Sequence, residues 1–592
     1  MSQVKERKEI DSKYKWSLED IFESDDKWER AFSAIRLRAE KFSRFQGGVA
    51  ENGETLAEVM RELAELSDEL LSVYVYARMR RDEDNEVSNY RGMSERAEEL
   101  QSDVVGNISF FEPELISAGR EKIDSLIKEN EKLSVYVHFF DNLFREAEHI
   151  LSEREEKLLA MSLGMSESAH SIFSALNNAD LKFGEIADKD GKLHELTHGR
   201  YGIFLESADR TLRQAAYEAM YAQYKKYKNT FAASYSGSVK SDLFFARARK
   251  YKSTLDMRLS DSNVSESVYD GLIEEVSKGI PVLSDYLRYR KEKLGLSELC
   301  MYDLYTPLVS EDEGEIPFEE ACNIVLAAVA PLGEQYVSDM KRAFSEGWID
   351  VYENRGKTPG AYSWGDNVHH PFVLLNYQGK LEDVFTLAHE MGHAMHSYYT
   401  NKTQDSIYRD YKIFVAEVAS TVNENLLLEY LLRDASGKRR EYLLGRRLEA
   451  IRTTFYRQTM FAEFERRAHS SYAAGEALTA ESLCGMYSEI NKKYYGDVCV
   501  CDENIAYEWA RIPHFYSSFY VYQYATGFAA ATRIKELVLS SQDNACKYIE
   551  FLKSGNSDYP LALLKATGVD LEKGDAARAV ICDMKEALDE LK

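Results

Sequence analysis

Apolar residues recur every three or four positions over most of the chain, which is the spacing of an amphipathic helix. The clearest run follows Thr55 and comprises Leu56, Val59, Met60, Leu63, Leu66, Leu70 and Val73. Similar patterns predict further helices over residues 87–108, 124–144, 152–176, 211–250, 265–294, 318–344, 441–471 and 479–495. Proline breaks helices, and the chain has only nine prolines. A mostly α fold is therefore predicted.

The helical pattern stops at a polar segment over residues 181–202. Within it Asp190-Gly191 is a typical hairpin turn. We place the main boundary here, with a helical N-terminal region over residues 1–195 and a second region over residues 196–592.

Residues 349–377 are the best candidate for β structure, because Gly, Pro and aromatic residues separate short apolar runs. A small sheet here would offer an edge on which an extended peptide can add as a strand. Gly360, Ala361, Tyr362 and Gly365 are the candidate peptide-binding residues, since glycine lets a backbone approach closely. The alternative is that these glycines only make turns.

The composition excludes some classes of partner. The formal charge is −26, from 74 basic and 100 acidic residues, and such a field disfavours nucleic acids and anionic membranes. The N-terminal residues have no apolar signal region, and no later run is long enough to span a bilayer. Seven scattered cysteines fit a reducing compartment. A cytoplasmic protein without nucleic-acid or membrane partners is expected.

The candidate chemistry centres on His389-Glu390-Met391-Gly392-His393, an H-E-x-x-H motif. On a helix, residues four apart leave the same face, so both imidazoles can meet on one zinc ion. Glu390 lies beside them as the candidate general base. The flanking residues are apolar, and burying these polar side chains without a metal would cost several kcal/mol. Two core histidines bonded to backbone carbonyls are the alternative.

A catalytic zinc needs a third protein ligand. His396 lies seven residues after His389, which is a rise of about 10.5 Å along a helix. The two imidazoles are then too far apart to bind the same ion, so His396 is expected to lie near the metal ligands without being one of them. The apolar helical stretch 414–432 carries Glu417 and Glu424 on one face. We assign Glu417 as the third ligand and Glu424 as an acceptor for a ligating histidine, the alternative for Glu424 being a surface carboxylate.

A second H-E-x-x-H runs from His194 to His198, just after the predicted turn. It has no apolar helical flanks, and Gly199 follows it directly. Its histidines are predicted to be turn and strand residues instead of metal ligands.

Several stretches together resemble the oligoendopeptidase F group of the thimet-oligopeptidase-like zinc peptidases. They are residues 360–365, 370–377, 389–396, 414–423, 511–516 and 519–527, and the similarity runs from about Tyr14 onward. The resemblance implies two helical regions flanking a substrate channel, with one zinc per chain and a small sheet beside the zinc helix. It also implies internal cleavage of short unfolded peptides, with residues 196–592 as the catalytic region.

In the resembled family a histidine and tyrosines of the segment corresponding to residues 507–527 stabilise the oxyanion. The candidates here are His514, Tyr520 and Tyr522. Tyr522 is favoured over Tyr520 and Tyr524, although the spacing differs from the family's. The alternative functions are a zinc exopeptidase, such as a dipeptidyl carboxypeptidase or metallocarboxypeptidase, and a non-catalytic peptide-binding protein.

Overall fold

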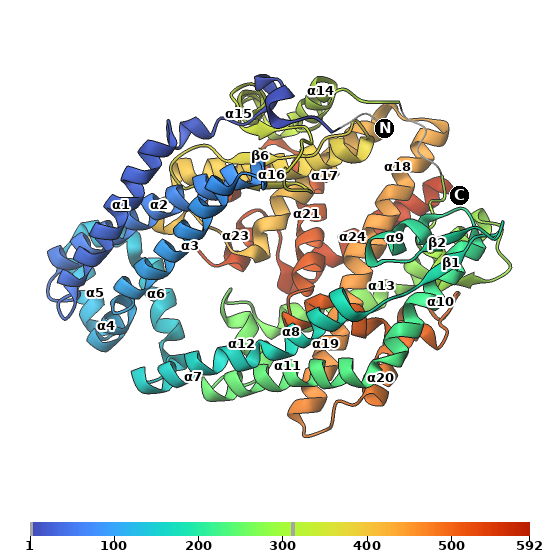
Figure 1. Ribbon diagram of the computed structural model, residues 1–592, viewed down its shortest axis with the longest axis horizontal. Helices are drawn as coiled ribbons and strands as arrows, with labels where there is room; N and C mark the ends of the chain where they lie inside the picture. The colour runs from blue at the N-terminus through green and yellow to red at the C-terminus, as the bar shows by residue number, and fades with distance from the viewer. Residues whose placement is uncertain (1–3, 310–313) are drawn as a thin grey trace. The chain divides into compact units, whose positions relative to one another are not determined.

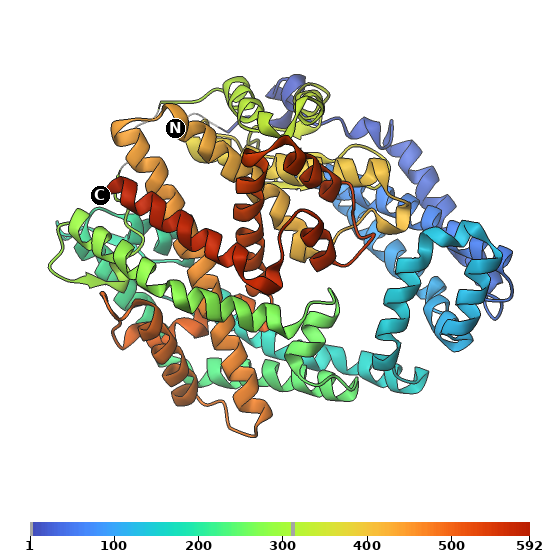
Figure 2. The same ribbon diagram turned by 180° about the vertical axis from the view of Figure 1, so that it is seen from behind.

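The computed structural model describes residues 4–309 and 314–592. Its described residues are mostly α-helical, with short strands, as Figures 1 and 2 show from opposite sides. The predicted mostly α class is confirmed.

Contacts between residues divide the chain into two compact units, each made of three stretches of the sequence. Unit 1 comprises Met1–Glu148, Glu313–Leu431 and Ile534–Gly568, and unit 2 comprises His149–Asp312, Leu432–Arg533 and Val569–Lys592. The boundary near residue 195 stays a prediction.

Unit 1 contains the N-terminal helices, the helices around the H-E-x-x-H motif and two helices from near the C-terminus. They are α1 (Asp25–Phe42), α2 (Gly53–Glu83), α3 (Ser88–Ile108), α4 (Phe111–Ala118), α5 (Arg120–Glu129), α6 (Val137–Glu146), α14 (Phe318–Ala328), α15 (Glu334–Ser345), α16 (Leu381–Thr403), α22 (Gln542–Leu552) and α23 (Pro560–Ala566). Helix α17 (Ile413–Asp434) begins in this unit.

The core of unit 1 joins the N-terminal helices to the sheet. Trp28 of α1 is fully buried and donates its indole N–H to the Val73 carbonyl of α2 at 2.8 Å. Phe372 and Leu374 belong to the same buried cluster as residues from Trp16 to Leu143. The sheet therefore depends on the N-terminal helices for its apolar contacts.

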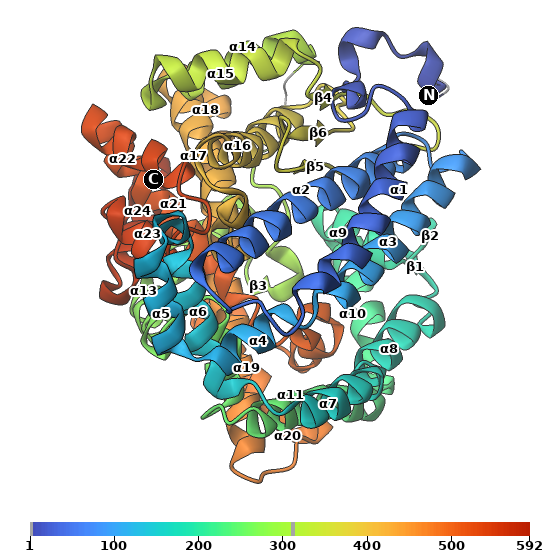
Figure 3. The same cartoon turned by 90° about the vertical axis from the view of Figure 1, so that its left-hand side faces the viewer.

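The sheet has three short strands in the order β4-β6-β5, and it lies beside α16 (Figure 3). The strands are β4 (Ile349–Asp350), β5 (Tyr362–Trp364) and β6 (Phe372–Leu374). β4 is parallel and β5 antiparallel to β6. This confirms the predicted β structure in residues 349–377, and β5 is an edge strand among the described strands.

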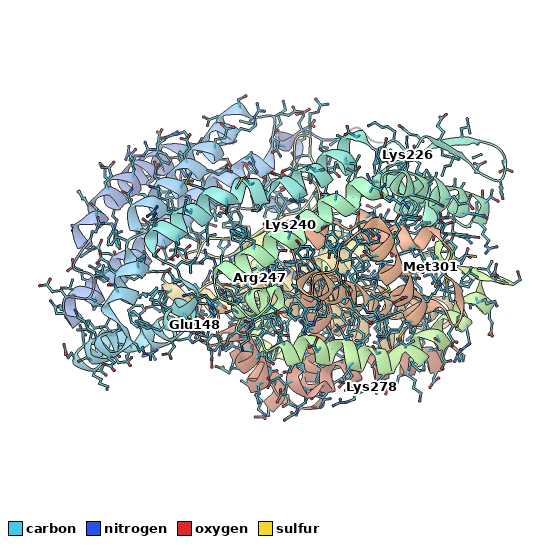
Figure 4. The ribbon with its side chains drawn as sticks, turned by 90° about the horizontal axis from the view of Figure 1, so that it is seen from below. Glu148, Lys226, Lys240, Arg247, Lys278 and Met301 are labelled. Atoms are coloured by element: carbon cyan, nitrogen blue, oxygen red, sulfur yellow. The ribbon has the colours of Figure 1, made fainter. Side chains whose placement is uncertain are left out.

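Unit 2 is built from long helices and two small two-stranded sheets. They are α7 (Glu153–Ser166), α8 (Ser168–Ala175), β1 (Glu185–Ala187), β2 (Leu193–Glu195), α9 (His198–Glu206), α10 (Arg210–Lys226), α11 (Lys228–Ala248), α12 (Thr254–Ser260), α13 (Glu266–Lys293), β3 (Leu299–Cys300), α18 (Gly437–Ala450), α19 (Arg457–Ala473), α20 (Ala480–Tyr495), β7 (Cys499–Val500) and α24 (Asp575–Leu591). Helix α21 (Tyr522–Ser540) begins in this unit. Lys240 and Arg247, both on α11, are labelled in Figure 4.

Five predicted helices are each divided in the structure. The helix over 152–176 becomes α7 and α8, and the helix over 211–250 becomes α10 and α11. The helix over 124–144 breaks at Asn130, whose side chain accepts a hydrogen bond from the Lys132 N–H and starts a short 3-10 turn. The helix over 318–344 breaks at Pro331, in a 3-10 turn between α14 and α15. The helix over 441–471 contains a π-helical segment, Ile451–Tyr456, between α18 and α19.

Among the described helices, none combines the length and the apolar character that crossing a bilayer requires. All seven cysteines are free thiols.

Candidate active site

His389 and His393 lie one turn apart on α16, and their ring centroids are 4.9 Å apart. Both Nε2 atoms face the same carboxylate oxygen of α17. Glu417 Oε2 lies 3.6 Å from Nε2 of His389 and 3.7 Å from Nε2 of His393. One ligand atom from each of the three residues lies within 4.8 Å of the others. The structure therefore brings together the three predicted ligands, two imidazoles and one carboxylate, as a zinc ion requires.

Gly392 allows α16 and α17 to approach closely enough for this arrangement. A Cβ atom at this position would lie 2.6 Å from both the Ala419 carbonyl oxygen and the Ser420 Cα of α17. The helix contact is further fixed by Asn423, whose amide donates to the Ala388 carbonyl at 3.2 Å. The small residue inside the motif thus sets the distance between the histidines and Glu417.

Glu424 holds the imidazole of His389 from the opposite side. Its Oε1 lies 2.7 Å from His389 Nδ1, so Nε2 is left for the metal. Burial alone would lower the pKa of His389, but the hydrogen bond and charge of Glu424, with the nearby carboxylates Glu390 and Glu417, raise it to about 9. Burial and the charge of His389 lower the pKa of His393 to about 4.

Glu390 is 7% exposed and lies next to the two histidines. Burial raises its pKa to about 7, and the charges of Glu417 and Glu424 act in the same direction. His389 and the backbone N–H of Ser363 in β5 lower it. A carboxyl group with a pKa near neutrality suits proton transfer at physiological pH.

The candidate peptide-binding residues lie at the start and end of β5. Gly360 has a positive φ of 88°, and its carbonyl accepts a hydrogen bond from Asn376 at 2.8 Å. A Cβ on Gly365 would lie 3.0 Å from the Pro371 Cα, and the Tyr362 hydroxyl donates to Asp82 at 3.0 Å. Both glycines thus have a role within the chain itself, and peptide binding by Gly360, Ala361, Tyr362 and Gly365 stays a prediction.

His396 lies in the core of unit 1 beneath the motif. Its ring stacks on Tyr411 with centroids 3.8 Å apart and also contacts Phe551. It is 1% exposed, and burial lowers its pKa to about 3. It is outside the ligand group found in the described residues, and its neutral ring supports α16 by packing.

The candidate oxyanion donors lie in unit 2, between a 3-10 turn (Pro513–Tyr516) and the start of α21. The rings of His514, Tyr520 and Tyr524 form a cluster with centroids 5.4 to 6.2 Å apart. Tyr522 is 3% exposed and packs on Tyr269, 5.0 Å away. The structure therefore groups Tyr524, instead of the favoured Tyr522, with His514 and Tyr520.

A buried carboxyl group fixes the loop that carries these tyrosines. Phe519 has a φ of 58°, which is unusual for a residue with a side chain. Its N–H donates to Oε1 of the fully buried Glu465 at 2.8 Å. Burial raises the pKa of Glu465 well above its ordinary value. The side chain of Glu465 thus stabilises the bend immediately before Tyr520.

The second H-E-x-x-H does not form a comparable site. His194 lies on β2 and contacts Asp188 at 2.8 Å, and β1 and β2 form the predicted hairpin. His198 begins α9 and contacts the Asn177 carbonyl at 2.9 Å. The two rings therefore serve separate local contacts. His194 is a strand residue as predicted, whereas His198 lies in a helix and not in a turn or strand.

Comparison with known proteins places this geometry in a family. The model of peptidase family M3 matches residues 203–580, and the oligopeptidase F model matches residues 114–183. The chain belongs to peptidase family M3. This M3 peptidase is 43% identical to "Oligopeptidase PepF" of Bacillus subtilis over 593 residues, covering 100% of this chain and 88% of the relative. It is 40% identical to the "Oligoendopeptidase F homolog" of Lactococcus lactis, over 100% of this chain and 98% of that one.

Solved structures agree with the family assignment. A putative peptidase from Chlamydophila abortus has a TM-score of 0.94 at 34% identity, covering 100% of this chain and 99% of the other. Oligoendopeptidase-F from Enterococcus faecium has a TM-score of 0.73 at 34% identity, with coverages of 96% and 98%. As a member of this family the chain is a metallo-endopeptidase.

Sequence reasoning missed two contributors to the site of this M3 peptidase. Gly392 stands at a variable position of the motif, although a glycine within a buried helix is itself a signal of close helix packing. Ser363 is the second contributor, because its backbone N–H lowers the pKa of Glu390. In β5 the aromatic neighbours Tyr362 and Trp364 pack against the core of unit 1, so strand alternation directs Ser363 to the other face.

Proposed function

We propose that this M3 peptidase is a zinc-dependent endopeptidase that hydrolyses internal peptide bonds of short, unfolded oligopeptides. The observation that carries the proposal is the convergence of His389, His393 and Glu417, with Glu390 beside them. One zinc per chain is the stoichiometry that this single group supports.

The donor set fits zinc. Two imidazole nitrogens and a carboxylate oxygen leave one of the four positions of a tetrahedral ion for water or substrate. Glu424 holds His389 in the tautomer that presents Nε2, and the Ser420 hydroxyl donates to Oε2 of Glu417 at 3.1 Å. When bound, zinc supplies Lewis-acid polarisation of the scissile carbonyl and lowers the pKa of water to about 7.

Glu390 moves the proton in the proposed reaction. Its carboxylate accepts a proton from the attacking water and delivers it to the departing amine. The pKa of about 7 applies without a metal charge beside the group, and bound zinc would favour the ionised form that accepts the proton. The low exposure of Glu390 keeps bulk water from competing for that proton.

We further propose that His514 and a tyrosine hydroxyl donate hydrogen bonds to the developing oxyanion. The rings of Tyr520 and Tyr524 cluster with His514, which favours these two tyrosines as donors. The burial of Tyr522 against Tyr269 argues against Tyr522 as the donor.

The open edge of β5, next to Glu390, is proposed to bind the substrate backbone as an added strand. Such binding would recognise peptides without regard to their side chains.

The first test measures cleavage of an end-blocked, internally quenched peptide of roughly ten residues, a length within reach of a strand-adding site. We expect internal cleavage that a strong zinc chelator abolishes and that added zinc restores. Product mapping distinguishes the alternatives, because an exopeptidase needs a free terminus. A protein that contains zinc but leaves the peptide intact would contradict the endopeptidase.

The second test changes the proposed base. Glu390→Gln is expected to keep the metal and to lower kcat by a factor of at least about 10² to 10⁴, the contribution of a general base. Glu195→Gln is the matched control, because it makes the same change in the second H-E-x-x-H and should leave turnover unaltered. Wild-type turnover of Glu390→Gln with full metal content would exclude Glu390 as the base.

A further inference from the structure

Unit 2 contains a group of arginines that outnumbers its acidic partners and includes Arg511, three residues before His514. Three carboxylates are each shared by two guanidinium groups. Asp303 pairs with Arg210 and Arg213, Glu449 with Arg290 and Arg452, and Glu508 with Arg457 and Arg511. This excess of positive charge occurs in a chain whose formal charge is −26.

Most of these charges are shielded from water. Arg452 is 0% exposed, Arg290 1% and Glu508 4%. The side chains of Arg457 and Arg511 are 17% and 24% exposed, so solvent compensates their charge only in part. An uncompensated buried charge destabilises a fold. A carboxylate nearby, Asp502, accepts from the Tyr217 hydroxyl and has no arginine partner in the described part of the chain.

A cavity of about 20 Å³ lies within this group. Its lining includes Arg452, Arg457, Arg511, Glu508, Tyr201 and Tyr221. A cavity of this size holds one water molecule or one monatomic ion.

The arginines at this cavity differ in how many of their donors are used. Arg452 donates to both oxygens of Glu449 and to the Leu304 carbonyl. Arg457 donates to Glu508 at 2.5 Å, and Arg511 contacts the Tyr221 hydroxyl at 3.5 Å and Glu508 at 3.8 Å. A guanidinium has five N–H donors, so within the described residues Arg457 and Arg511 keep donors for another acceptor.

We propose that this cavity binds one monovalent inorganic anion of halide size, held by Arg457 and Arg511. A halide accepts several N–H and O–H bonds at once and adds the negative charge that the group lacks. A water molecule fits the same space but leaves the charge excess unchanged. The ion joins α19, which carries Arg457, to the 3-10 segment Asn504–Arg511, so its expected effect is on the stability of unit 2.

Crystallography with bromide tests the site directly, on the full-length wild-type protein. Bromide replaces chloride and has an anomalous X-ray signal. We expect a bromide peak in the cavity, in contact with both guanidinium groups. A peak without anomalous signal is a water molecule, and either that result or an empty cavity would overturn the proposal.

Thermal unfolding tests whether binding occurs at ordinary salt concentrations. At fixed ionic strength, replacing sodium gluconate by sodium chloride or bromide should raise the Tm of the wild type in a saturable way, because a ligand that binds only the folded state stabilises it. Gluconate is too large for the cavity. An equal Tm in all three salts would show that any bromide peak reflects binding at crystal concentration only, and would overturn the proposal.

The matched variants are Arg511→Gln and Arg288→Gln. Arg511→Gln removes a proposed anion contact and should abolish the halide-specific rise in Tm. Arg288 lies on α13 of the same unit, is half exposed and pairs with Asp285 and Asp497, so its variant should keep the full halide response. If Arg511→Gln does not fold, the wild-type bromide and Tm measurements still decide the question.

Discussion

Gly392 shows how a single backbone position controls the metal site. Its missing side chain leaves room for the Ala419 carbonyl of α17. Gly392→Ala should push the two helices apart, lower the stability by about 1–3 kcal/mol as overpacking does, and weaken zinc binding. Zinc affinity by chelator competition and Tm provide the measurement.

Gly445→Ala is the matched control for that variant. Gly445 also lies within a helix, α18, but a Cβ there meets no atom within 4 Å. The control should keep zinc affinity and gain about 0.5–1 kcal/mol, since alanine is the better helix former. If both variants bind zinc as the wild type does, the close approach at Gly392 is not what positions Glu417.

The three tyrosines after His514 can be separated by removing one hydroxyl at a time. Tyr520→Phe or Tyr524→Phe should lower kcat by about 10²–10³ if that hydroxyl stabilises the oxyanion. Tyr522→Phe should change kcat little, because Tyr522 is buried against Tyr269. Steady-state kinetics with zinc content measured in each variant distinguishes the cases, and a large loss confined to Tyr522→Phe would restore the sequence-based preference.

At the level of elements, the sequence predicts those features that depend on local patterns. The heptad-like run after Thr55 predicts α2, which the structure extends to Gly53–Glu83, and the hairpin at Asp190-Gly191 follows from a turn dipeptide. Which tyrosine is the oxyanion donor stays a prediction, and the segment before Tyr520 contains a bend at Phe519, which adopts a positive φ. That conformation depends on Glu465, fifty-four residues earlier in the chain, and no local pattern contains it.

His469 of α19 gives unit 2 a pH-dependent stability. The ring contacts Phe519, is fully enclosed, and has no hydrogen-bond partner for either nitrogen among the described residues. Burial lowers its pKa to about 3. Below pH 6.5 the unfolded chain therefore binds a proton that the folded chain does not. The free energy of unfolding should fall with pH between about 6.5 and 3, by up to about 1.4 kcal/mol per pH unit.

The variant His469→Leu isolates this contribution. Its loss of stability between pH 7 and pH 5 should be smaller than that of the wild type by about 2 kcal/mol. Denaturant unfolding at both pH values is the measurement. Equal pH dependence in the two proteins would mean that the folded protein protonates this ring as readily as the unfolded chain does.

At the scale of the whole molecule, the residues predicted for the active site are divided between the two units. The predicted metal ligands lie in unit 1 and His514 in unit 2, and each unit is assembled from three stretches of chain. The H-E-x-x-H motif could be found from the sequence because helical spacing relates its histidines, and Glu417 because it shares one face of an apolar helical stretch with Glu424. The division into units could not, because it depends on contacts between residues hundreds of positions apart, such as Trp16 and Phe372.

The long-range packing leads to a prediction about fragments. The sheet beside α16 buries Phe372 and Leu374 in a core whose other residues lie between Trp16 and Leu143. A fragment of residues 196–592 lacks that core and should neither fold cooperatively nor bind zinc. Co-expression with residues 1–195 should restore both properties, because the cut falls directly after an exposed hairpin strand, where a chain break disturbs little packing. Circular dichroism melting and zinc content measure the outcome. A fragment 196–592 that melts cooperatively and binds zinc alone would show that the N-terminal region is a separate domain.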